Sequence, residues 1–210
     1  MPPIDVMLNA FVTLFVTIDP IGLAPIFLAV TSGASKQARI KIGTRAVIVA
    51  AGILLIFALI GHVILQVLGI SLPAFRIAGG LLLFAIAFEM VFEKREKRKS
   101  QSAEQALSDD EMHDIAVFPL AIPLIAGPGA ISAVLLLGSQ SSDWISRGAI
   151  FAIVIFVLLL VLLTFVIAGW VEKMMGESGR NILTRLLGVL LAALSVQFIA
   201  DGIKAIIAVG

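Results

Sequence analysis

The chain contains no cysteine and no tyrosine, and it has only 2 histidines and 2 tryptophans among its 210 residues. Without cysteine, a disulfide framework, a thiolate metal site and a thiol redox relay are all excluded. Charged residues make up only 14% of the chain and nearly cancel to a net charge of +1, which gives no indication of nucleic acid binding. By contrast, 60% of the residues are hydrophobic, well above the roughly 45–50% of soluble domains. This composition predicts a membrane protein.

Six stretches of the chain are long and apolar enough to cross a bilayer, which takes about 20 residues in a helix. They cover residues 6–30, 45–69, 72–92, 115–138, 146–170 and 182–207. We therefore predict an all-α membrane protein with six transmembrane helices.

Lysine and arginine are distributed unevenly between the two sides of these spans. Of the 15 basic residues, twelve lie in or next to loops 31–44, 93–114 and 171–181. The opposite side has only Arg76, Arg147 and Lys204. Because loops rich in Lys and Arg stay in the cytoplasm, these three loops are predicted to be cytoplasmic and both termini periplasmic.

Residues 93–114 form the only long polar segment and divide the chain into 1–92 and 115–210. The segment begins with a basic run and continues with several acidic residues. Such blocks of charge are typical of a solvated linker, and we interpret it as a cytoplasmic linker between two halves. A regulatory or lipid-binding loop is the alternative.

The two halves share a sequence pattern. Arg-x-x-Gly-x-Leu-Leu begins at Arg76 and again at Arg185, which is 109 residues later. Pro20 and Pro128, in the first and fourth spans, are 108 residues apart. Since each half has three spans, an odd number, the halves are expected to cross the membrane in opposite senses. We predict two inverted three-helix repeats.

Helix-breaking residues cluster near the middle of the first and fourth spans. The clusters are Thr17-Ile18-Asp19-Pro20-Ile21-Gly22-Leu23-Ala24-Pro25 and Pro119-Leu120-Ala121-Ile122-Pro123, followed by Ala126-Gly127-Pro128-Gly129-Ala130. Lipid cannot satisfy free backbone groups, so such breaks have to be shielded by protein or by a water-filled cavity. Paired breaks in corresponding halves indicate a transporter's substrate site. We predict that helices 1 and 4 are broken near the midplane and meet there.

Each cluster has the residues that begin a second half-helix. Asp19 and Gly127 suit the cap position, and Pro20 and Pro128 suit the first helical position. The free N–H groups and the positive end of the helix dipole attract an anion such as a carboxylate. The predicted substrate-binding residues are Asp19, Pro20, Gly22, Pro25, Gly127, Pro128, Gly129 and, deeper in the sixth span, Gln197.

Asp19 is the one acidic residue near the predicted midplane. It has two interpretations that can coexist. Its carboxylate caps the half-helix, or it holds an ammonium group, a sodium ion or a transported proton. Two anion-binding helix ends together with one carboxylate fit a zwitterion, such as a small amino acid.

These motifs resemble those of the MarC family over nearly the whole chain. The residues that carry the resemblance are Asp19-Pro20-Ile21-Gly22-x-x-Pro25-Ile26-Phe27, the second cluster from Pro119 to Gly129, Arg76-Ile77-Ala78-Gly79-Gly80, Arg185-Leu186-x-Gly188 and Gln197-Phe198-Ile199-x-x-Gly202-Ile203. The resemblance implies a six-span protein of the bacterial inner membrane. Since some members transport neutral amino acids, it also implies a secondary transporter of small neutral amino acids that works by alternating access.

Two other functions stay open. A drug or metabolite exporter would use the same fold with a larger cavity. An intramembrane enzyme would need a positioned nucleophile and base, for which Ser132 and His62 are the candidates, but no nucleophile motif surrounds Ser132. We therefore expect a transporter rather than an enzyme, with no cofactor and no nucleic acid partner, coupled to protons or sodium. The partners expected are a neutral amino acid and the lipid bilayer.

Overall fold

The computed structural model describes residues 4–95, 98–101, 115–139 and 144–209. Its elements are α1 (Ile4–Ile18), α2 (Pro20–Val30), α3 (Lys36–Val67), α4 (Leu72–Val91), the irregular helix η1 (Ala116–Ile125), α6 (Pro128–Ser139), α7 (Trp144–Val166) and α8 (Ala168–Val209). None of the described residues lies in a β-strand, so the all-α prediction is confirmed for this part of the chain. Residues 102–114 of the predicted linker lie outside it.

Five helices are long and apolar enough to cross a membrane, or six if a bent pair counts as one span. α1 and α2 together form the first, Ile4–Val30, and the bent pair is Ala116–Ile125 with Pro128–Gly138. Five to six candidate spans agree with the predicted integral membrane protein.

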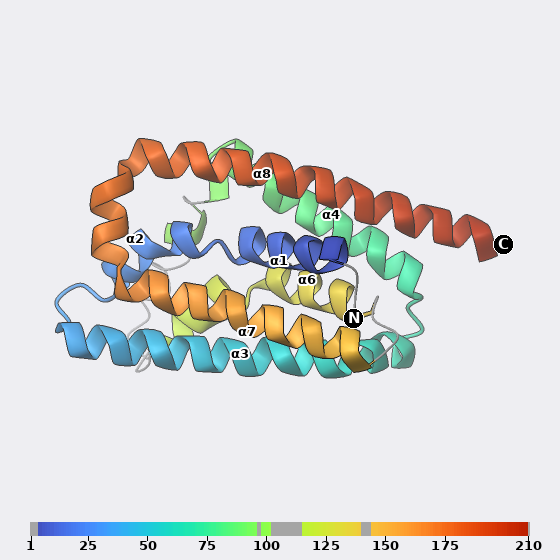
Figure 1. The fold of residues 1–210 in the computed structure, drawn as a ribbon, viewed down its shortest axis with the longest axis horizontal. Helices are drawn as coiled ribbons and strands as arrows, with labels where there is room; N and C mark the ends of the chain where they lie inside the picture. The colour runs from blue at the N-terminus through green and yellow to red at the C-terminus, as the bar shows by residue number, and fades with distance from the viewer. Residues whose placement is uncertain (1–3, 96–97, 102–114, 140–143, 210) are drawn as a thin grey trace.

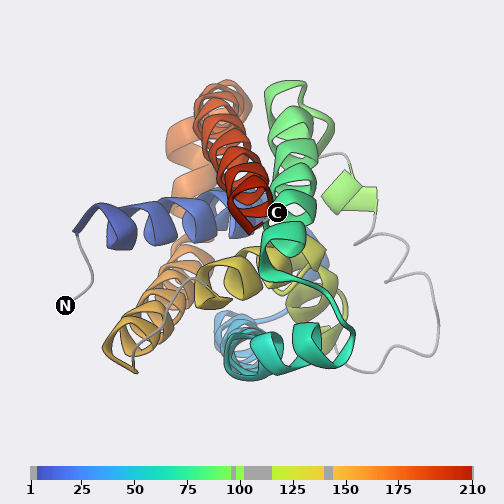
Figure 2. The ribbon, with the colours of Figure 1, turned by 90° about the vertical axis from the view of Figure 1, so that its right-hand side faces the viewer.

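The spans run alternately in opposite directions along the long axis of a helical bundle (Figure 1). The beginning of α1 and the end of α8 lie at the same end of the bundle. The α1–α2 span is the most enclosed of the five unbent candidate spans, since 67% of its apolar stretch is buried, against 22% for the span within α8. The view along the bundle shows the other helices arranged around the inner end of α1 (Figure 2). The first span therefore lies in the interior of the bundle.

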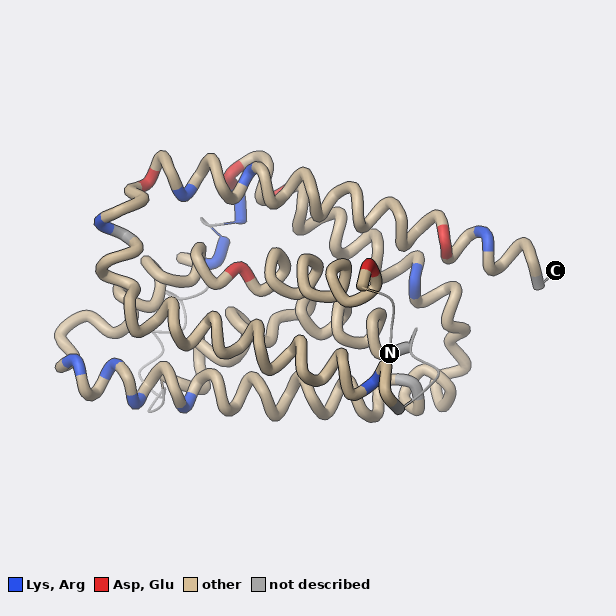
Figure 3. Tube along the Cα trace, in the orientation of Figure 1, with Lys and Arg blue, Asp and Glu red and all other residues tan. Residues whose placement is uncertain are grey.

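Basic residues gather at the end of the bundle away from the start of α1 (Figure 3). This end contains the residues around the beginning of α3, the segment that follows α4 and the first turns of α8. Loops rich in Lys and Arg stay in the cytoplasm, and the loops at this end are predicted to be cytoplasmic for that reason.

Two helices begin earlier than the sequence predicts. α3 begins at Lys36 rather than near residue 45, because Ser35 caps it by accepting a hydrogen bond from Ala38 N at 3.2 Å. Residues 171–181, predicted to be a loop, are helical and form part of α8. Gly176 interrupts this helix with φ 58° and ψ −178°, a conformation open almost only to glycine. The predicted loop is therefore a helical connection, which is interrupted at Gly176.

Glycines bring α4 and α8 into close contact. A Cβ atom at Gly80 would lie 2.9 Å from the carbonyl oxygen of Ser195 and 2.7 Å from Cγ1 of Ile199. A Cβ atom at Gly188 would lie 3.1 Å from the carbonyl oxygen of Ala87. Small residues let helix backbones approach closely in membranes, where packing rather than hydrophobicity holds helices together. These glycines therefore set the distance between α4 and α8.

The variant Gly80→Leu is expected to destabilise the protein by about 1–3 kcal/mol, because the added side chain overpacks the interface and one of its neighbours is backbone. The matched control is Gly52→Leu in α3, where a Cβ atom would meet nothing within 4 Å. Thermal unfolding in detergent measures both. Equal melting temperatures for the two variants would contradict close α4–α8 packing at Gly80.

Candidate functional site

The chain changes course between α1 and α2 at Asp19. Asp19 has a left-handed backbone with φ 59° and ψ 68°, which aspartate tolerates better than most residues. Its carboxylate accepts a hydrogen bond from Gly22 N at 3.0 Å and so caps α2. A Cβ atom at Gly22 would lie 2.1 Å from Asp19 Oδ2, so glycine there makes room for the cap. Pro20 follows as the first helical residue, where its missing N–H costs nothing.

The second change of course separates η1 from α6, whose axes are bent by 56°. Within η1, Phe118 and Ile122 leave helical geometry; each of them precedes a proline, and proline disfavours helical geometry in the residue before it. A Cβ atom at Gly127 would lie 2.4 Å from the carbonyl oxygen of Pro123. Glycine is therefore needed where the backbone bends before α6 begins at Pro128.

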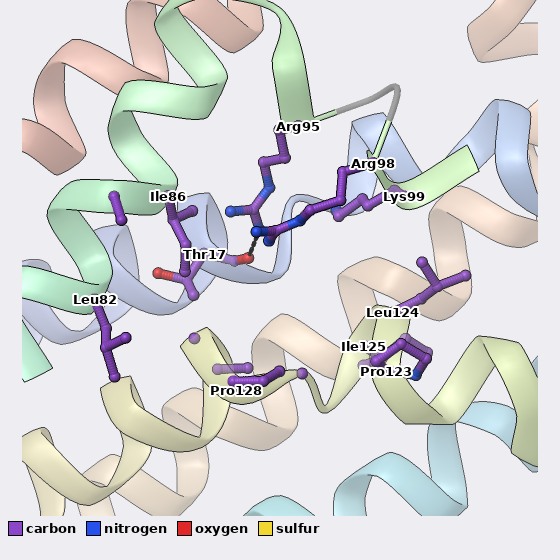
Figure 4. Close-up of a pocket in the computed structure, with 14 residues that line it drawn as sticks. Thr17, Leu82, Ile86, Arg95, Arg98, Lys99, Pro123, Leu124, Ile125 and Pro128 are labelled. Carbon is purple, nitrogen blue, oxygen red and sulfur yellow. Dashed lines mark hydrogen bonds between the residues drawn. The ribbon is translucent and has the colours of Figure 1, made fainter. Parts of the chain in front are cut away.

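A cavity of about 300 Å³ lies beside these two helix ends (Figure 4). Contact between the end of α1 and the start of α6 is direct, since a Cβ atom at Gly129 would lie 3.2 Å from Cγ2 of Thr17. The cavity is lined by residues of four segments: Thr17 from α1; Leu82, Ala85 and Ile86 from α4; Arg95, Arg98 and Lys99; and Pro123, Leu124, Ile125, Gly127, Pro128, Gly129 and Ala130. It is thus apolar on the α4 side, basic on a second side and bounded by backbone at the start of α6.

Two basic side chains bond the backbone that the end of α1 leaves free. Arg95 Nη2 donates to the carbonyl oxygen of Thr17, and Lys99 Nζ donates to that of Ile18 at 3.2 Å. The last carbonyls of a helix lack partners within it and carry partial negative charge. Arg95 and Lys99 therefore stabilise the interruption at Asp19 from a segment about 80 residues away in sequence.

Lys99 also forms an ion pair with Asp19, with 3.5 Å between Nζ and Oδ2, and both side chains are buried. Burial lowers the pKa of Lys99 to about 8, since desolvation outweighs the attraction of Asp19. Burial likewise lowers the pKa of Arg95, against the attraction of Asp19. Arg98 also lines the cavity and forms an ion pair with Glu89, with 2.6 Å between Nη1 and Oε1. The basic wall therefore consists of two paired cations and Arg95.

The structure brings together some of the predicted binding residues. Gly127, Pro128 and Gly129 line the cavity, and Asp19 bonds Lys99, which also lines it. Pro20 and Gly22 are buried beside Asp19 but do not line the cavity. Pro25 instead borders Val171, Met175 and Gly176 of α8.

Gln197 was predicted to line the cavity, and in the structure it does not. Its side chain is exposed and donates from Nε2 to Asp201 Oδ1 at 2.8 Å. The two residues are four apart on α8, so an acceptor one turn along the same helix satisfies the amide.

The polar cavity-lining residues that the predicted binding set did not contain are Thr17, Arg95, Arg98 and Lys99. The basic run 94–99 was interpreted as solvated, yet Arg95 is 5% and Lys99 8% exposed. One available signal in the sequence was their spacing of four residues, which would place two cations on one face if the segment were helical. Their partners are mostly backbone carbonyls, which leave no trace in a sequence.

Comparison with known proteins places this chain in one family. The model of "MarC family integral membrane protein" matches residues 4–207. The chain is 39% identical over 193 residues to UPF0056 membrane protein MJ0972 of Methanocaldococcus jannaschii, covering 92% of this chain and 84% of that one. It is 39% identical over 200 residues to UPF0056 membrane protein YhcE of Escherichia coli, covering 93% and 91%. With UPF0056 membrane protein YvbG of Bacillus subtilis it shares 34% over 198 residues, 94% of each chain.

No solved structure matches the chain. The family match, the relatives and the candidate spans all agree with the resemblance inferred from the paired motifs. The chain belongs to the MarC family of integral membrane proteins.

Proposed function

We propose that this protein is a secondary transporter of small neutral amino acids that works by alternating access around the cavity between the two helix ends. The observation that carries the proposal is the cavity itself, which lies where irregular backbone from two interrupted spans meets. Backbone of this kind at membrane depth is tolerated where it is buried in protein or lines a cavity. A volume of about 300 Å³ is at the low end of ligand pockets, which range over about 300–1,000 Å³. It therefore favours a small solute over a drug.

Alternating access requires two halves that move against each other, and inverted repeats supply them. Reciprocal contacts of α4 and α8 support such a repeat with an offset of 108 residues, which is the offset of Pro20 and Pro128 and one less than that of the motifs at Arg76 and Arg185. Gly80 meets Ser195 and Ile199, and Gly188 meets Ala87 and Val91. Adding 108 to the numbers of Gly80, Ala87 and Val91 gives those of Gly188, Ser195 and Ile199, so each contact has its counterpart.

The packing of the other helices supports the same relation. α3 of the first half packs against η1 and α6 of the second. In turn, α7 of the second half packs against α1 and α2 of the first. Each half thus holds the interrupted span of the other, and a rocking motion of one half against the other would expose the cavity first to one side and then to the other.

Uptake of labelled L-alanine into proteoliposomes, with an imposed proton or sodium gradient, tests the transport proposal. We expect uptake that exceeds that of protein-free liposomes and depends on one of the gradients. The variant Gly129→Leu should reduce uptake at least tenfold, because a Cβ atom there already lies 2.1 Å from Cδ1 of Ile86 and the rest of the side chain would enter the cavity. Gly52→Leu, in open space, is the control. Absence of uptake under every gradient, for alanine and for glycine, would refute the proposal.

The proposed location is the inner membrane, with both termini in the periplasm. Because the chain has no cysteine, single-cysteine variants can report sidedness. In intact cells, a membrane-impermeant maleimide should label Ile70→Cys, between α3 and α4, and should label Ser178→Cys only after permeabilisation. Both residues are exposed. The connection between α3 and α4 and the first part of α8 lie at opposite ends of the bundle (Figure 1). The reverse labelling pattern would mean that the basic end faces outward.

A further inference from the structure

Arg95 is a buried cation with unused hydrogen-bonding capacity beside the cavity. Only 5% of the residue is exposed. Its Nη2 donates to Thr17 O, whereas Nε and Nη1 have no partner among the described residues. Figure 4 shows the side chain extending from its own segment to the end of α1 at the cavity wall. Leaving charged donors buried and unpaired is costly, so buried charges are normally paired.

The charges around the cavity do not cancel. Arg98 is paired with Glu89, and Lys99 with Asp19. Arginine keeps its proton in proteins, so Arg95 leaves the described part of the wall with one uncompensated positive charge.

Asp19, the acid that the sequence offered for an ammonium group, is already occupied. Its Oδ1 accepts from Gly22 N and its Oδ2 from Lys99 Nζ. An ammonium group bound to Asp19 would therefore have to displace Lys99, and the positive charge of Arg95 nearby would repel it.

The start of α6, which forms another side of the cavity, favours an anion, as Arg95 does. Gly127, Pro128 and Gly129 line the cavity at the N-terminus of this twelve-residue helix. The free N–H groups and the dipole at such an end favour an anion. Two independent features thus point to negative charge on the ligand.

We propose that Arg95 binds the carboxylate of the cargo and that the cargo class is small monocarboxylates, in which an amino group is not required. This inference rests on the transport function proposed above and extends its substrate class from neutral amino acids to small monocarboxylates. Thr17 Oγ1 is buried, has no partner in the described structure and lies on the same cavity. A hydroxyl oxygen both donates and accepts, so Thr17 accommodates either a hydroxyl or an amino group beside the carboxylate.

The test measures binding to purified protein in detergent by thermal stabilisation, which follows ligand affinity without requiring transport. The probes are L-alanine, L-lactate, which has a hydroxyl in place of the amino group, and L-alaninamide, which has no carboxylate. We expect lactate to bind at least as tightly as alanine and alaninamide not to bind. Alanine binding more than tenfold tighter than lactate, or binding of alaninamide, would overturn the inference.

Variants connect the binding to Arg95. Arg95→Gln should weaken lactate binding about ten- to a hundredfold, the usual effect of losing a charge-assisted hydrogen bond. Arg95→Lys keeps the charge and should weaken it less, which separates loss of charge from misfolding. Lys94→Gln, an exposed neighbour, should leave binding unchanged. Equal lactate affinity in Arg95→Gln and the wild-type protein would overturn the role of Arg95.

The two proposals fail in different ways. Lactate binding that needs Arg95, without uptake of any solute into proteoliposomes, would refute transport and leave the binding inference standing. Uptake of alanine that is unaffected by Arg95→Gln and by excess lactate would support transport and refute the inference.

Discussion

Replacing Lys99 with methionine is expected to lower the free energy of unfolding by about 3–5 kcal/mol, the usual cost of leaving one partner of a buried ion pair without the other. Lys99 Nζ bonds both Asp19 Oδ2 and the carbonyl oxygen of Ile18. Methionine matches its length but donates nothing, so both acceptors lose this donor in a buried place. The matched control is Lys94→Met. Lys94 is exposed, and its Nζ lies 6.0 Å from the centroid of the Phe88 ring. Its cost should stay below about 1 kcal/mol.

Substitution of the ion-pair partner, Asp19→Asn, should lower the free energy of unfolding much less, by about 1 kcal/mol. Asparagine caps a helix as well as aspartate does and tolerates a left-handed backbone, so the bond from Gly22 N persists. Lys99, whose pKa is already about 8, can lose its proton once its counter-charge is gone. The double variant Asp19→Asn with Lys99→Met should therefore recover most of the stability that Lys99→Met loses.

Unfolding measured for the four proteins gives the coupling between the two residues. A cost for Lys99→Met that is unchanged in the Asp19→Asn background would show that Lys99 acts on the backbone of α1 rather than on Asp19.

The residues at which α2 and α6 begin could be predicted from the sequence, because the causes are local. Pro20 lacks an N–H group, Asp19 provides a cap, and Gly22 leaves room for the carboxylate. At the second break, Pro128 likewise lacks an N–H group, and Gly127 leaves room beside the carbonyl oxygen of Pro123. Each of these effects acts within a few residues, so a sequence pattern carries it fully.

The basic wall could not be predicted, because its partners are distant in sequence. Arg95 and Lys99 bond carbonyl oxygens near Asp19, and a run of charge ordinarily indicates a solvated segment. Gln197 is the opposite case, because it was predicted to line the cavity and does not. A polar residue within an apolar span predicts a function, but Asp201 on the next turn already satisfies it. The sequence alone does not show whether a polar side chain finds its hydrogen-bond partner within its own helix or in a distant segment.

Between about pH 8 and pH 10.5, Lys99 is expected to make the protein more stable as pH rises, while binding of a carboxylate becomes weaker. Burial lowers the pKa of Lys99 most; Asp19 raises this pKa, and Arg95 and Arg98 lower it further. The net result is a decrease from 10.5 to about 8. Over that interval the unfolded chain binds more protons than the folded one, so the free energy of unfolding rises with pH, by up to about 3 kcal/mol at 1.36 kcal/mol per pH unit. Below pH 8 both states are protonated and this contribution is flat.

Ligand binding responds with the opposite sign, because loss of the proton removes one positive charge from the cavity wall and leaves Asp19 without its counter-charge. Lactate affinity should therefore fall above about pH 8, where the ligand itself no longer titrates. Lys99→Met lacks the titrating group, so its stability and its affinity should both lose this pH dependence. Thermal unfolding from pH 7 to 10.5, with and without lactate, measures both quantities on the same samples. Stability and affinity that change in the same direction, or curves for Lys99→Met that run parallel to the wild-type curves, would show that another group titrates and that Lys99 does not control the charge of the cavity.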